Sequence, residues 1–322
     1  MKVLVAGASG TLGRPLVAAL RAGGHEVSGV TRTPAKAAAL EATGARPVMV
    51  DALDAEALTR AVEEAAPEAI VHLLTALPRR GPTRFRELRA TNRLRIEGTR
   101  NLIAAARAAG AHRLVAESAV FAYGFGDHGD VTLDESIAPV PEQLGRAANE
   151  AQQACLLLES QLLEASRESA LEGVVLRLGF LYGPGVPSAE FMLAMLRRRM
   201  MALPGGGQAI VPWIEIGDAV AAFAAALERG PGREIYNIVD DQPVTIAEFL
   251  AELARVSSAP EPYRIPHWLA RLAMPAGAQL LGRTTLRASN AKAKRLLGWT
   301  PEHRSYQTGL RHWHQQLIRT TQ

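Results

Sequence analysis

The fold is decided by residues 3–13, which read VLVAGASGTLG, an apolar run followed by three spaced glycines. The apolar run with its valines predicts a buried strand, and a helix is expected to open within the glycine segment. Gly7 permits the tight turn, Gly10 lets a pyrophosphate approach the backbone, and Gly13 lets the helix pack closely on the sheet. Free N–H groups at the start of that helix attract phosphate oxygens. The segment therefore predicts a dinucleotide-binding turn between strand and helix.

The same alternation continues through the first half of the chain. Further apolar strands are expected at residues 26–31, 47–50, 69–74, 112–116 and 173–178. Helical patterns separate them at residues 12–21, 35–42, 55–65, 84–109 and 147–169. Strands this apolar, joined by helices, form a parallel sheet that is covered on both faces. The predicted fold class is α/β, a doubly wound parallel sheet of the Rossmann type.

Beyond residue 180 the pattern is less regular. Glycine clusters at residues 183–185 and 205–207 separate shorter elements. Residues 125–141 are expected to form a loop, because Gly, Asp and Pro occur there. We expect a dinucleotide-binding core at residues 1–180 and a smaller, mostly substrate-binding cap at residues 181–322. Segments near residues 210–240 are expected to return to the core.

Composition narrows the functional classes. Apolar residues make up 48% of the chain and charged residues 21%, as in globular proteins. The net charge of +4 is scattered and only 5% of residues are aromatic, so no nucleic-acid partner is expected. No run of 18 apolar residues occurs, so no membrane partner is expected. A single cysteine favours a reducing compartment. We expect a cytoplasmic monomer or homodimer with a small-molecule substrate.

Cofactor choice is set at the end of the second expected strand. An acidic residue there binds NAD, whereas this chain has Arg32 and, one helical turn on, Lys36. Arg32 suits the 2′-phosphate of NADP, so NADP is favoured and NAD is the alternative. Asp51 either accepts from the adenine amino group or caps the next turn. The predicted cofactor-binding residues are Gly7, Ser9, Gly10, Thr11, Leu12, Gly13, Arg32, Asp51, Leu73 and Asn92.

Further motifs are spread over most of the chain. Besides the glycine loop they are Ile70-Val71-His72-Leu73, Thr91-Asn92, Glu97-Gly98-Thr99-Arg100-Asn101-Leu102, Val115-Ala116-Glu117-Ser118, Tyr123-Gly124, Leu181-Tyr182-Gly183-Pro184-Gly185 and Leu296-Leu297-Gly298-Trp299-Thr300-Pro301. Together they resemble the short-chain dehydrogenase/reductase superfamily, in its extended, epimerase/dehydratase-like branch. The resemblance implies NAD(P) binding, and it makes Asn92 the asparagine that holds the active-site helix.

The resemblance also implies a catalytic pair, Tyr-x-x-x-Lys, in which the lysine binds the nicotinamide ribose. Alignment on Glu159 places this pair at Ala151 and Cys155, and neither side chain can perform its chemistry. No tyrosine occurs in residues 124–181 and no lysine in residues 37–291, so the pair is missing in any register. The chain is expected to be an atypical member.

A substitute proton donor is expected near the end of the fifth strand, where α/β sheets bind ligands. Tyr123 is the leading catalytic candidate and Ser118 its alternative or helper, since the family's serine or threonine corresponds to Ala119. The competing interpretation is that Tyr123 only packs under the loop. Glu117 acts as a base or pairs with an arginine, and Arg177 binds the substrate or a neighbouring acid.

Three functions fit these residues. The favoured one is an NADP-dependent oxidoreductase with a non-standard proton donor, acting on a small carbonyl or alcohol. The alternatives are a redox-neutral epimerase or isomerase that retains NAD(P), and a non-catalytic NADP-binding regulator. The missing pair favours the regulator, whereas the long cap favours an enclosed small-molecule site. No metal site is expected, because His312 and His314 have no third ligand nearby.

Overall fold

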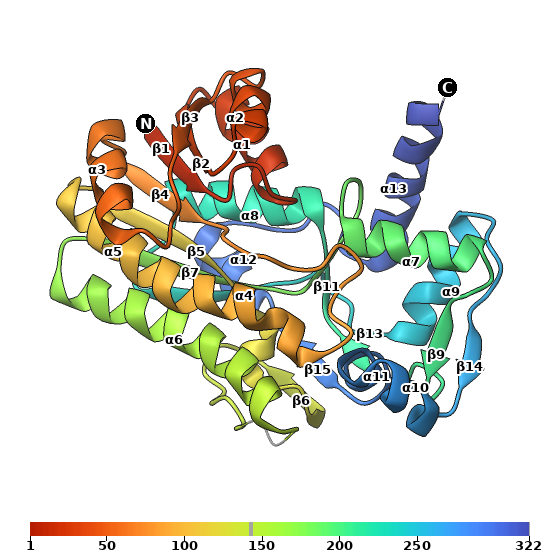
Figure 1. Ribbon diagram of the computed structural model, residues 1–322. Coiled ribbons are helices and arrows are strands. Elements are labelled where there is room, and N and C mark those ends of the chain that lie inside the picture. The colour runs from red at the N-terminus through yellow and green to blue at the C-terminus, as the bar shows by residue number, and fades with distance from the viewer. Residues whose placement is uncertain (142–143, 322) are drawn as a thin grey trace.

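The computed structural model describes residues 1–141 and 144–321, and it centres on a seven-stranded parallel sheet (Figure 1). The strands are β1 (Lys2–Ala6), β2 (Glu26–Thr31), β3 (Arg46–Met49), β4 (Ala69–His72), β5 (Arg113–Ala119), β7 (Glu172–Leu178) and β12 (Glu234–Ile238). Their spatial order is β3-β2-β1-β4-β5-β7-β12. The order reverses between β1 and β4, where such sheets bind ligands beyond the carboxyl ends of the strands. The predicted fold class is confirmed.

Helices cover both faces of this sheet (Figure 1). The layer on one face contains α1 (Gly13–Ala22) and α8 (Ile216–Glu228), which contact each other. The opposite layer contains α3 (Ala55–Ala65), α5 (Thr99–Ala108) and α6 (Arg146–Glu168). Successive strand residues point to opposite faces, so a run of apolar residues fills both layers.

The long helix expected at residues 84–109 is a series of shorter helices. A 3-10 turn, η1 (Phe85–Leu88), leads into α4 (Arg89–Arg93). A π-helical turn, η2 (Leu94–Gly98), then precedes α5. A π turn holds more residues than an α turn and therefore changes which side chains face a neighbouring helix. Because η2 packs against α6, the π turn changes which side chains face α6 near the expected site.

A second sheet has four short strands in the order β13-β10-β15-β6. It is formed by β6 (Asp127–Leu133), β10 (Ile210–Val211), β13 (Val244–Thr245) and β15 (Thr285–Ala288). The loop predicted at residues 125–141 is therefore wrong over the length of β6. Most of β6 is exposed and carries no alternating apolar pattern, so its pairing with β15, far along the chain, leaves no local signal.

Most of the remaining elements belong to the second half of the chain. They are α2 (Pro34–Glu41), η3 (Val120–Tyr123), β8 (Phe180–Tyr182), α7 (Pro187–Arg197), β9 (Ala202–Pro204), β11 (Trp213–Glu215), α9 (Ile246–Val256), β14 (Tyr263–Ile265), α10 (His267–Ala273), α11 (Pro275–Gly282), α12 (Ala291–Leu297) and α13 (Tyr306–Thr321). Figure 1 shows α7, α9, α10 and α11 gathered on the right, beside the main sheet. β12 returns to that sheet and pairs with β7. Within the described ranges, no helix is long and apolar enough to cross a membrane.

Candidate functional site

The glycine loop joins β1 to α1 as the spacing predicts. Gly7 has a φ of 95°, and a Cβ there would lie 2.6 Å from the carbonyl oxygen of Leu73. A Cβ on Gly13 would lie 2.1 Å from the carbonyl oxygen of Gly7. These two glycines are required by packing inside the protein. A Cβ on Gly10, by contrast, would meet only the carbonyl oxygen of Gly7, at 3.0 Å, so its other side is open to a ligand.

The start of α1 offers donors to a phosphate group. Apart from residues 142–143 and 322, which are not described, no acceptor in the protein receives the N–H of Thr11 or Leu12. Neither residue caps the helix with its side chain. Unpaired N–H groups at a helix N-terminus bind anionic oxygens well. The loop therefore fits a pyrophosphate, with Ser9, Gly10, Thr11 and Leu12 forming its rim.

The two residues predicted to select the cofactor lie next to each other. Arg32 follows β2 and Asp51 follows β3, and their nearest nitrogen and oxygen are 3.6 Å apart. The Arg32 side chain is 65% exposed and that of Asp51 is 44% exposed, so both are accessible to a ligand. Asp51 also accepts a hydrogen bond from the N–H of Leu53 at 3.0 Å, as the capping alternative requires. The role of Arg32 in NADP binding stays a prediction.

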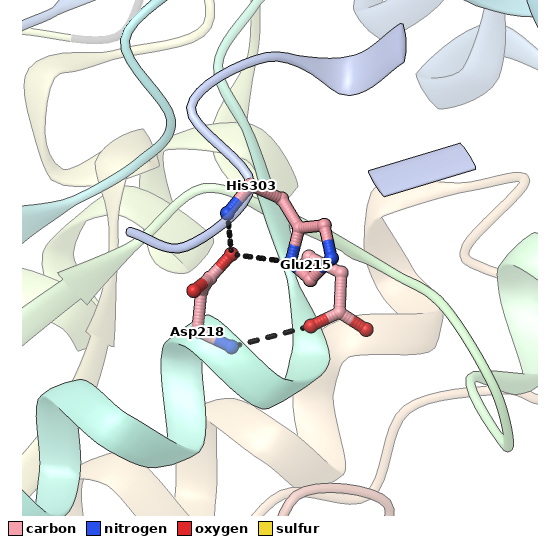
Figure 2. Close-up of side chains that lie close together, drawn as sticks. All are labelled: Glu215, Asp218 and His303. Atoms are coloured by element: carbon pink, nitrogen blue, oxygen red, sulfur yellow. Dashed lines mark hydrogen bonds and ion pairs between the residues drawn. The ribbon is translucent and has the colours of Figure 1, made fainter. Parts of the chain in front are cut away.

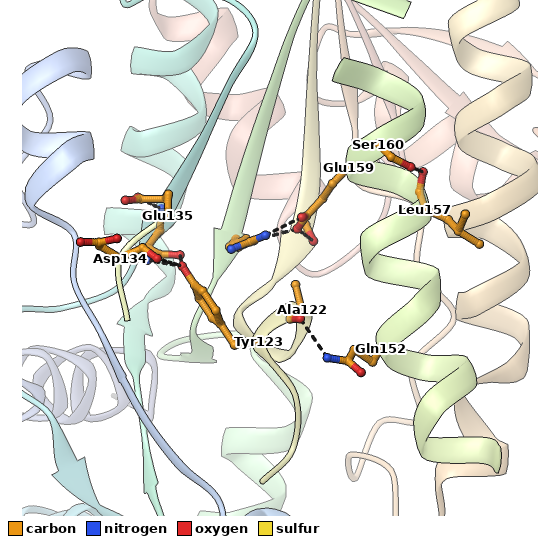
Figure 3. A network of polar contacts seen from close by, with 11 residues as sticks. Ala122, Tyr123, Asp134, Glu135, Gln152, Leu157, Glu159 and Ser160 are labelled. Carbon is orange, nitrogen blue, oxygen red and sulfur yellow. Dashed lines mark hydrogen bonds and ion pairs between the residues drawn. The ribbon is translucent and has the colours of Figure 1, made fainter. Parts of the chain in front are cut away.

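Tyr123 is fully buried and its hydroxyl is engaged (Figure 3). The hydroxyl donates to the carbonyl oxygen of Asp134 at 2.8 Å and accepts from the amide nitrogen of Asn237 at 3.0 Å. The Arg177 guanidinium lies over its ring, 4.6 Å from the centroid. Burial raises the pKa of Tyr123. These contacts favour the interpretation that Tyr123 packs under the loop rather than the one in which it donates a proton.

Ser118 belongs to a buried polar network around Glu159 of α6. Its hydroxyl donates to Glu159 Oε1 at 2.7 Å. Arg177 of β7 donates to both carboxylate oxygens of Glu159, at 2.9 and 2.7 Å. The alternative in which Arg177 pairs with a neighbouring acid is therefore observed, and Ser118 bonds the same carboxylate. The structure brings Ser118 and Tyr123 near one arginine but leaves neither hydroxyl free.

The helix face that should carry the catalytic pair is apolar. Ala151 lies in a cluster with Phe85, Phe121 and Phe125, whose rings make successive contacts of 4.8 to 4.9 Å between centroids. Cys155 is buried, and desolvation raises the pKa of its thiol, which makes it a poor nucleophile. The site next to α6 therefore presents a hydrophobic, aromatic wall.

Glu117 is the polar residue of β5 that remains available. The strand register pairs its neighbour Ala116 with His72, so Glu117 comes level with Leu73. The carbonyl oxygen of Leu73 leaves no room for a Cβ on Gly7. It is partly buried, and its carboxylate receives no hydrogen bond from any residue that the structure describes. Burial raises its pKa, an effect that the positive charge of Arg95 opposes. Asn92, a predicted site residue, is likewise buried with an unpaired side-chain oxygen.

A second polar cluster is formed by Glu215, Asp218 and His303 at the start of α8 (Figure 2). The resemblance pointed to the segment that holds Glu215 and Asp218, but no sequence signal joined His303 to them. Glu215 caps α8 by accepting from the N–H groups of Gly217 and Asp218. Asp218 accepts from the N–H of His303 at 3.0 Å and contacts its ring nitrogen Nδ1 at 3.1 Å. The cluster borders a cavity of about 630 Å³ that Thr11 also lines. Its hydrogen bonds fasten the start of α8 to the segment that follows α12.

Comparison with known proteins places this geometry in context. The chain is 41% identical to 3-diazoavenalumate denitrifying reductase from a Streptomyces species, over 96% of this chain and 99% of that one. It is 29% identical to 4-hydroxy-2-methyl-3-oxo-4-farnesyl-3,4-dihydroquinoline-1-oxide ketoreductase of Stigmatella aurantiaca, over 92% and 85%. These likenesses support an NAD(P)-dependent oxidoreductase or epimerase.

Solved structures show the same fold at lower identity. A UDP-glucose 4-epimerase of Thermotoga maritima, solved with UDP-glucose, has a TM-score of 0.82 and 22% identity over the whole of both chains. The UDP-glucose 4-epimerase of Thermus thermophilus, in complex with NAD, has a TM-score of 0.79 and 23% identity over 99% of each. The sequence model of the NAD dependent epimerase/dehydratase family matches residues 3–239, and the chain therefore belongs to that family.

Proposed function

We propose that this protein is an NAD(P)H-dependent reductase that removes nitrogen from a small aromatic diazo compound. The observation that carries the proposal is the apolar face of α6, where Ala151 and Cys155 leave no phenol or ammonium group. The relative that is 41% identical has a name that states a diazo substrate and a denitrifying reduction. The nicotinamide supplies a hydride when the cofactor is bound.

A diazonium group explains why a proton donor can be missing. Its terminal nitrogen accepts a hydride, and the cation R–N₂⁺ becomes the neutral diazene R–N=NH. The diazene then loses N₂ and leaves R–H, so one NAD(P)H is oxidised for each N₂ released. No proton enters the hydride step, whereas reduction of a carbonyl needs one at the oxygen. The aromatic wall formed by Phe85, Phe121 and Phe125 suits a planar ring, because aromatic rings pack favourably edge-on or offset.

The test is to measure N₂ release from a ¹⁵N-labelled hydroxyaryl diazonium salt together with oxidation of NADPH or NADH. We expect one equivalent of N₂ for each cofactor oxidised, at a rate proportional to protein concentration. Gly10→Val is the control for direct reaction with the cofactor, because its side chain occupies the open side of the glycine loop. A rate that Gly10→Val leaves unchanged, in a protein that remains folded, contradicts the proposal.

Carbonyl reduction is the second candidate, and Glu117 is the observation that favours it. A partly buried carboxyl group with a raised pKa, at the end of β5, is able to hold a proton for a substrate oxygen. The same panel therefore includes aldehydes, ketones and enones. Turnover of a ketone that Glu117→Gln lowers by 10²-fold or more, with no N₂ release from diazonium salts, supports this candidate instead.

A further inference from the structure

Arg95 is a buried cation without a partner. The residue lies in the π turn η2 and is 8% exposed. Its guanidinium forms no hydrogen bond, ion pair or ring contact with any part of the protein in residues 1–141 and 144–321, and its Nε is fully enclosed and unpaired. Guanidinium groups are rarely buried unless they are paired, because loss of hydration is costly. The arrangement indicates that a group outside the protein chain completes it.

The surroundings of Arg95 locate this unpaired cation at the ends of β4 and β5. His72 lies at the end of β4, and burial lowers its pKa. The positive charge of Arg95 lowers it further, and the two effects bring the pKa of His72 to about 3. The same charge acts on Glu117 of β5 and on Cys155 of α6. Hydrogen bonds place Arg95 there as well, because the Thr99 hydroxyl donates to the Arg95 carbonyl oxygen and contacts His72 Nε2 at 2.9 Å. The turn η2 that holds Arg95 also packs against α6. Cys155 is the position that the sequence alignment assigns to the family's lysine.

Glu117 is the complementary half of the arrangement. Its carboxylate only accepts hydrogen bonds, and it has no donor in the described protein. Arg95 only donates, and its guanidinium forms no ion pair with Glu117 or with any other residue that the structure describes. A group that both accepts and donates would satisfy both side chains. Vicinal hydroxyl groups of a sugar do both, since each oxygen accepts from a guanidinium and each O–H donates to a carboxylate.

The position of the two residues matches one part of a dinucleotide. β5 is two strands away from β1, a separation of about 10 Å at the usual strand spacing. Glu117 is level with Leu73, whose carbonyl borders the glycine loop. A dinucleotide with its pyrophosphate on that loop would reach the ends of β4 and β5 with one sugar. Its other sugar would lie in the opposite direction, toward Arg32 and Asp51.

We propose that Arg95 and Glu117 hold the nicotinamide ribose of the cofactor, with the guanidinium donating to its hydroxyl oxygens and the carboxylate accepting from its hydroxyl protons. The positive charge at this site then comes from η2 rather than from α6. Asn92, one helical turn before Arg95, has an unpaired side-chain oxygen and would border the same ligand. The inference rests on the proposed NAD(P) binding and assigns two positioning residues to it.

The experiment measures the affinities of three ligands of increasing size by calorimetry. The proteins compared are wild type, Arg95→Met and Glu117→Gln. ADP lacks the second ribose, ADP-ribose contains it, and NAD(P)H adds the nicotinamide. We expect Arg95→Met to lower the affinity for ADP-ribose and for NAD(P)H by about 10- to 100-fold and to leave the affinity for ADP unchanged. Glu117→Gln should lower the affinity for the same two ligands by a smaller factor, because its amide oxygen still accepts a hydrogen bond. Arg95→Lys should restore part of the affinity.

Thermal unfolding of the ligand-free variants supplies an independent readout. Removal of an unpaired buried cation should leave the Tm of Arg95→Met equal to that of wild type or higher. Arg93→Met is the matched control on the neighbouring helix α4, since Arg93 is exposed and pairs with Glu97. It should change neither the Tm nor any affinity by much.

The remaining outcomes overturn the inference in distinguishable ways. Equal affinities of Arg95→Met and wild type for all three ligands exclude a role at the ribose. Weakening of ADP to the same extent shows that Arg95 shapes the glycine loop instead. A raised KM for the second substrate at unchanged cofactor affinity assigns Arg95 to a substrate anion. If wild type binds no dinucleotide at all, the proposed function itself fails.

Discussion

At the scale of single residues, the polar groups near the end of β5 fall into two classes. Tyr123 and Ser118 have their hydroxyl groups engaged inside the protein. Arg177 donates to Glu159 from two of its three nitrogens, and its Nη1 is unpaired. The side chains of Glu117 and Arg95 have no such bonds among the described residues, although burial makes unpaired polar groups costly. A group whose bonds are already made serves stability, and a group that is kept buried and unpaired serves a ligand. This difference moves the expected chemistry from Tyr123 toward Glu117 and Arg95.

Tyr123→Phe tests the assignment of Tyr123 as proton donor directly. We expect turnover to stay within about threefold of wild type, while the free energy of unfolding falls by about 1 to 2 kcal/mol, because Asn237 and Asp134 lose a hydrogen-bonding partner. Chemical denaturation and steady-state kinetics on one preparation give both numbers. A 10²–10⁴-fold loss of turnover at unchanged stability is the result expected of a proton donor, and it restores Tyr123 to that role.

Arg32→Ala tests cofactor choice. Wild type is expected to bind NADPH more tightly than NADH, because Arg32 is exposed and its ion pair with Asp51 is weak enough to yield to a 2′-phosphate. The substitution should make the binding free energy of NADPH less favourable by about 1.5 to 3 kcal/mol and leave that of NADH almost unchanged. Fluorescence titration measures both affinities. Equal affinities for the two cofactors in wild type, and no effect of the substitution, refute the preference for NADP.

At the scale of elements, Glu159 joins α6 to two strands of the main sheet. Ser118 of β5 and Arg177 of β7 both bond its carboxylate, and all three residues are buried. A helix attached to adjacent strands in this way has its rotation fixed. The hydrogen bonds of Glu159 therefore fix which face of α6 is turned toward the site.

Glu159→Gln should be strongly destabilising, because it leaves the buried Arg177 guanidinium without its carboxylate. Removal of one partner from a buried ion pair costs about 3 to 5 kcal/mol. Glu150→Gln on the same helix is the control: its pair with Arg146 is exposed and should contribute less than about 1 kcal/mol. Urea unfolding compares the two. Similar small losses for both variants mean that the buried pair does not anchor α6.

At the scale of the whole molecule, the second half of the chain is tied to the first by contacts between distant residues. β12 adds the final strand to the main sheet, and the amide group of its Asn237 bonds the carbonyl oxygens of Leu133 and Ser289. Just beyond β12 lies Asp240, which is buried with one carboxylate oxygen unpaired. We expect the stability of the protein to depend on pH at this junction.

Asp240→Asn should stabilise the protein at neutral and higher pH. Burial, with a further contribution from Asp241, raises the pKa of Asp240 to about 8. The folded state therefore holds a proton that the unfolded state releases near pH 4, and stability falls as pH rises from about 4 to about 8. We expect the substitution to reduce this slope and to add about 1 kcal/mol or more at pH 8. Tm measured from pH 5 to 9 checks it.

Asp241→Asn is the matched control for this measurement. Asp241 is bonded to Asn290 and Lys294, so its substitution should lower stability across the same pH range. If Asp240→Asn is also destabilising at pH 8, the carboxyl group of Asp240 is ionised and satisfied in the folded protein.

The sequence predicts those features whose signals are local. The glycine loop, the alternation of strands and helices, and the absence of the Tyr-Lys pair all follow from short stretches. The partners of Tyr123 and Ser118 do not, since Asn237 and Glu159 are distant in the sequence. Arg95 was also missed, because a regular helix was expected at residues 84–109 and the π turn that holds it has no sequence signature.

The pairing of β6 with β15 has a consequence for how the chain folds. About 150 residues separate the two strands, so β6 waits roughly 8 to 30 s for its partner at a synthesis rate of about 5–20 residues per second. An unpaired strand edge invites association with other chains during that interval. β6 carries Asp127, Gly129 and Asp130, and charges and glycine discourage such pairing. The polar residues of β6 thus have two effects: they leave no strand pattern in the sequence, and they disfavour aggregation of the nascent chain.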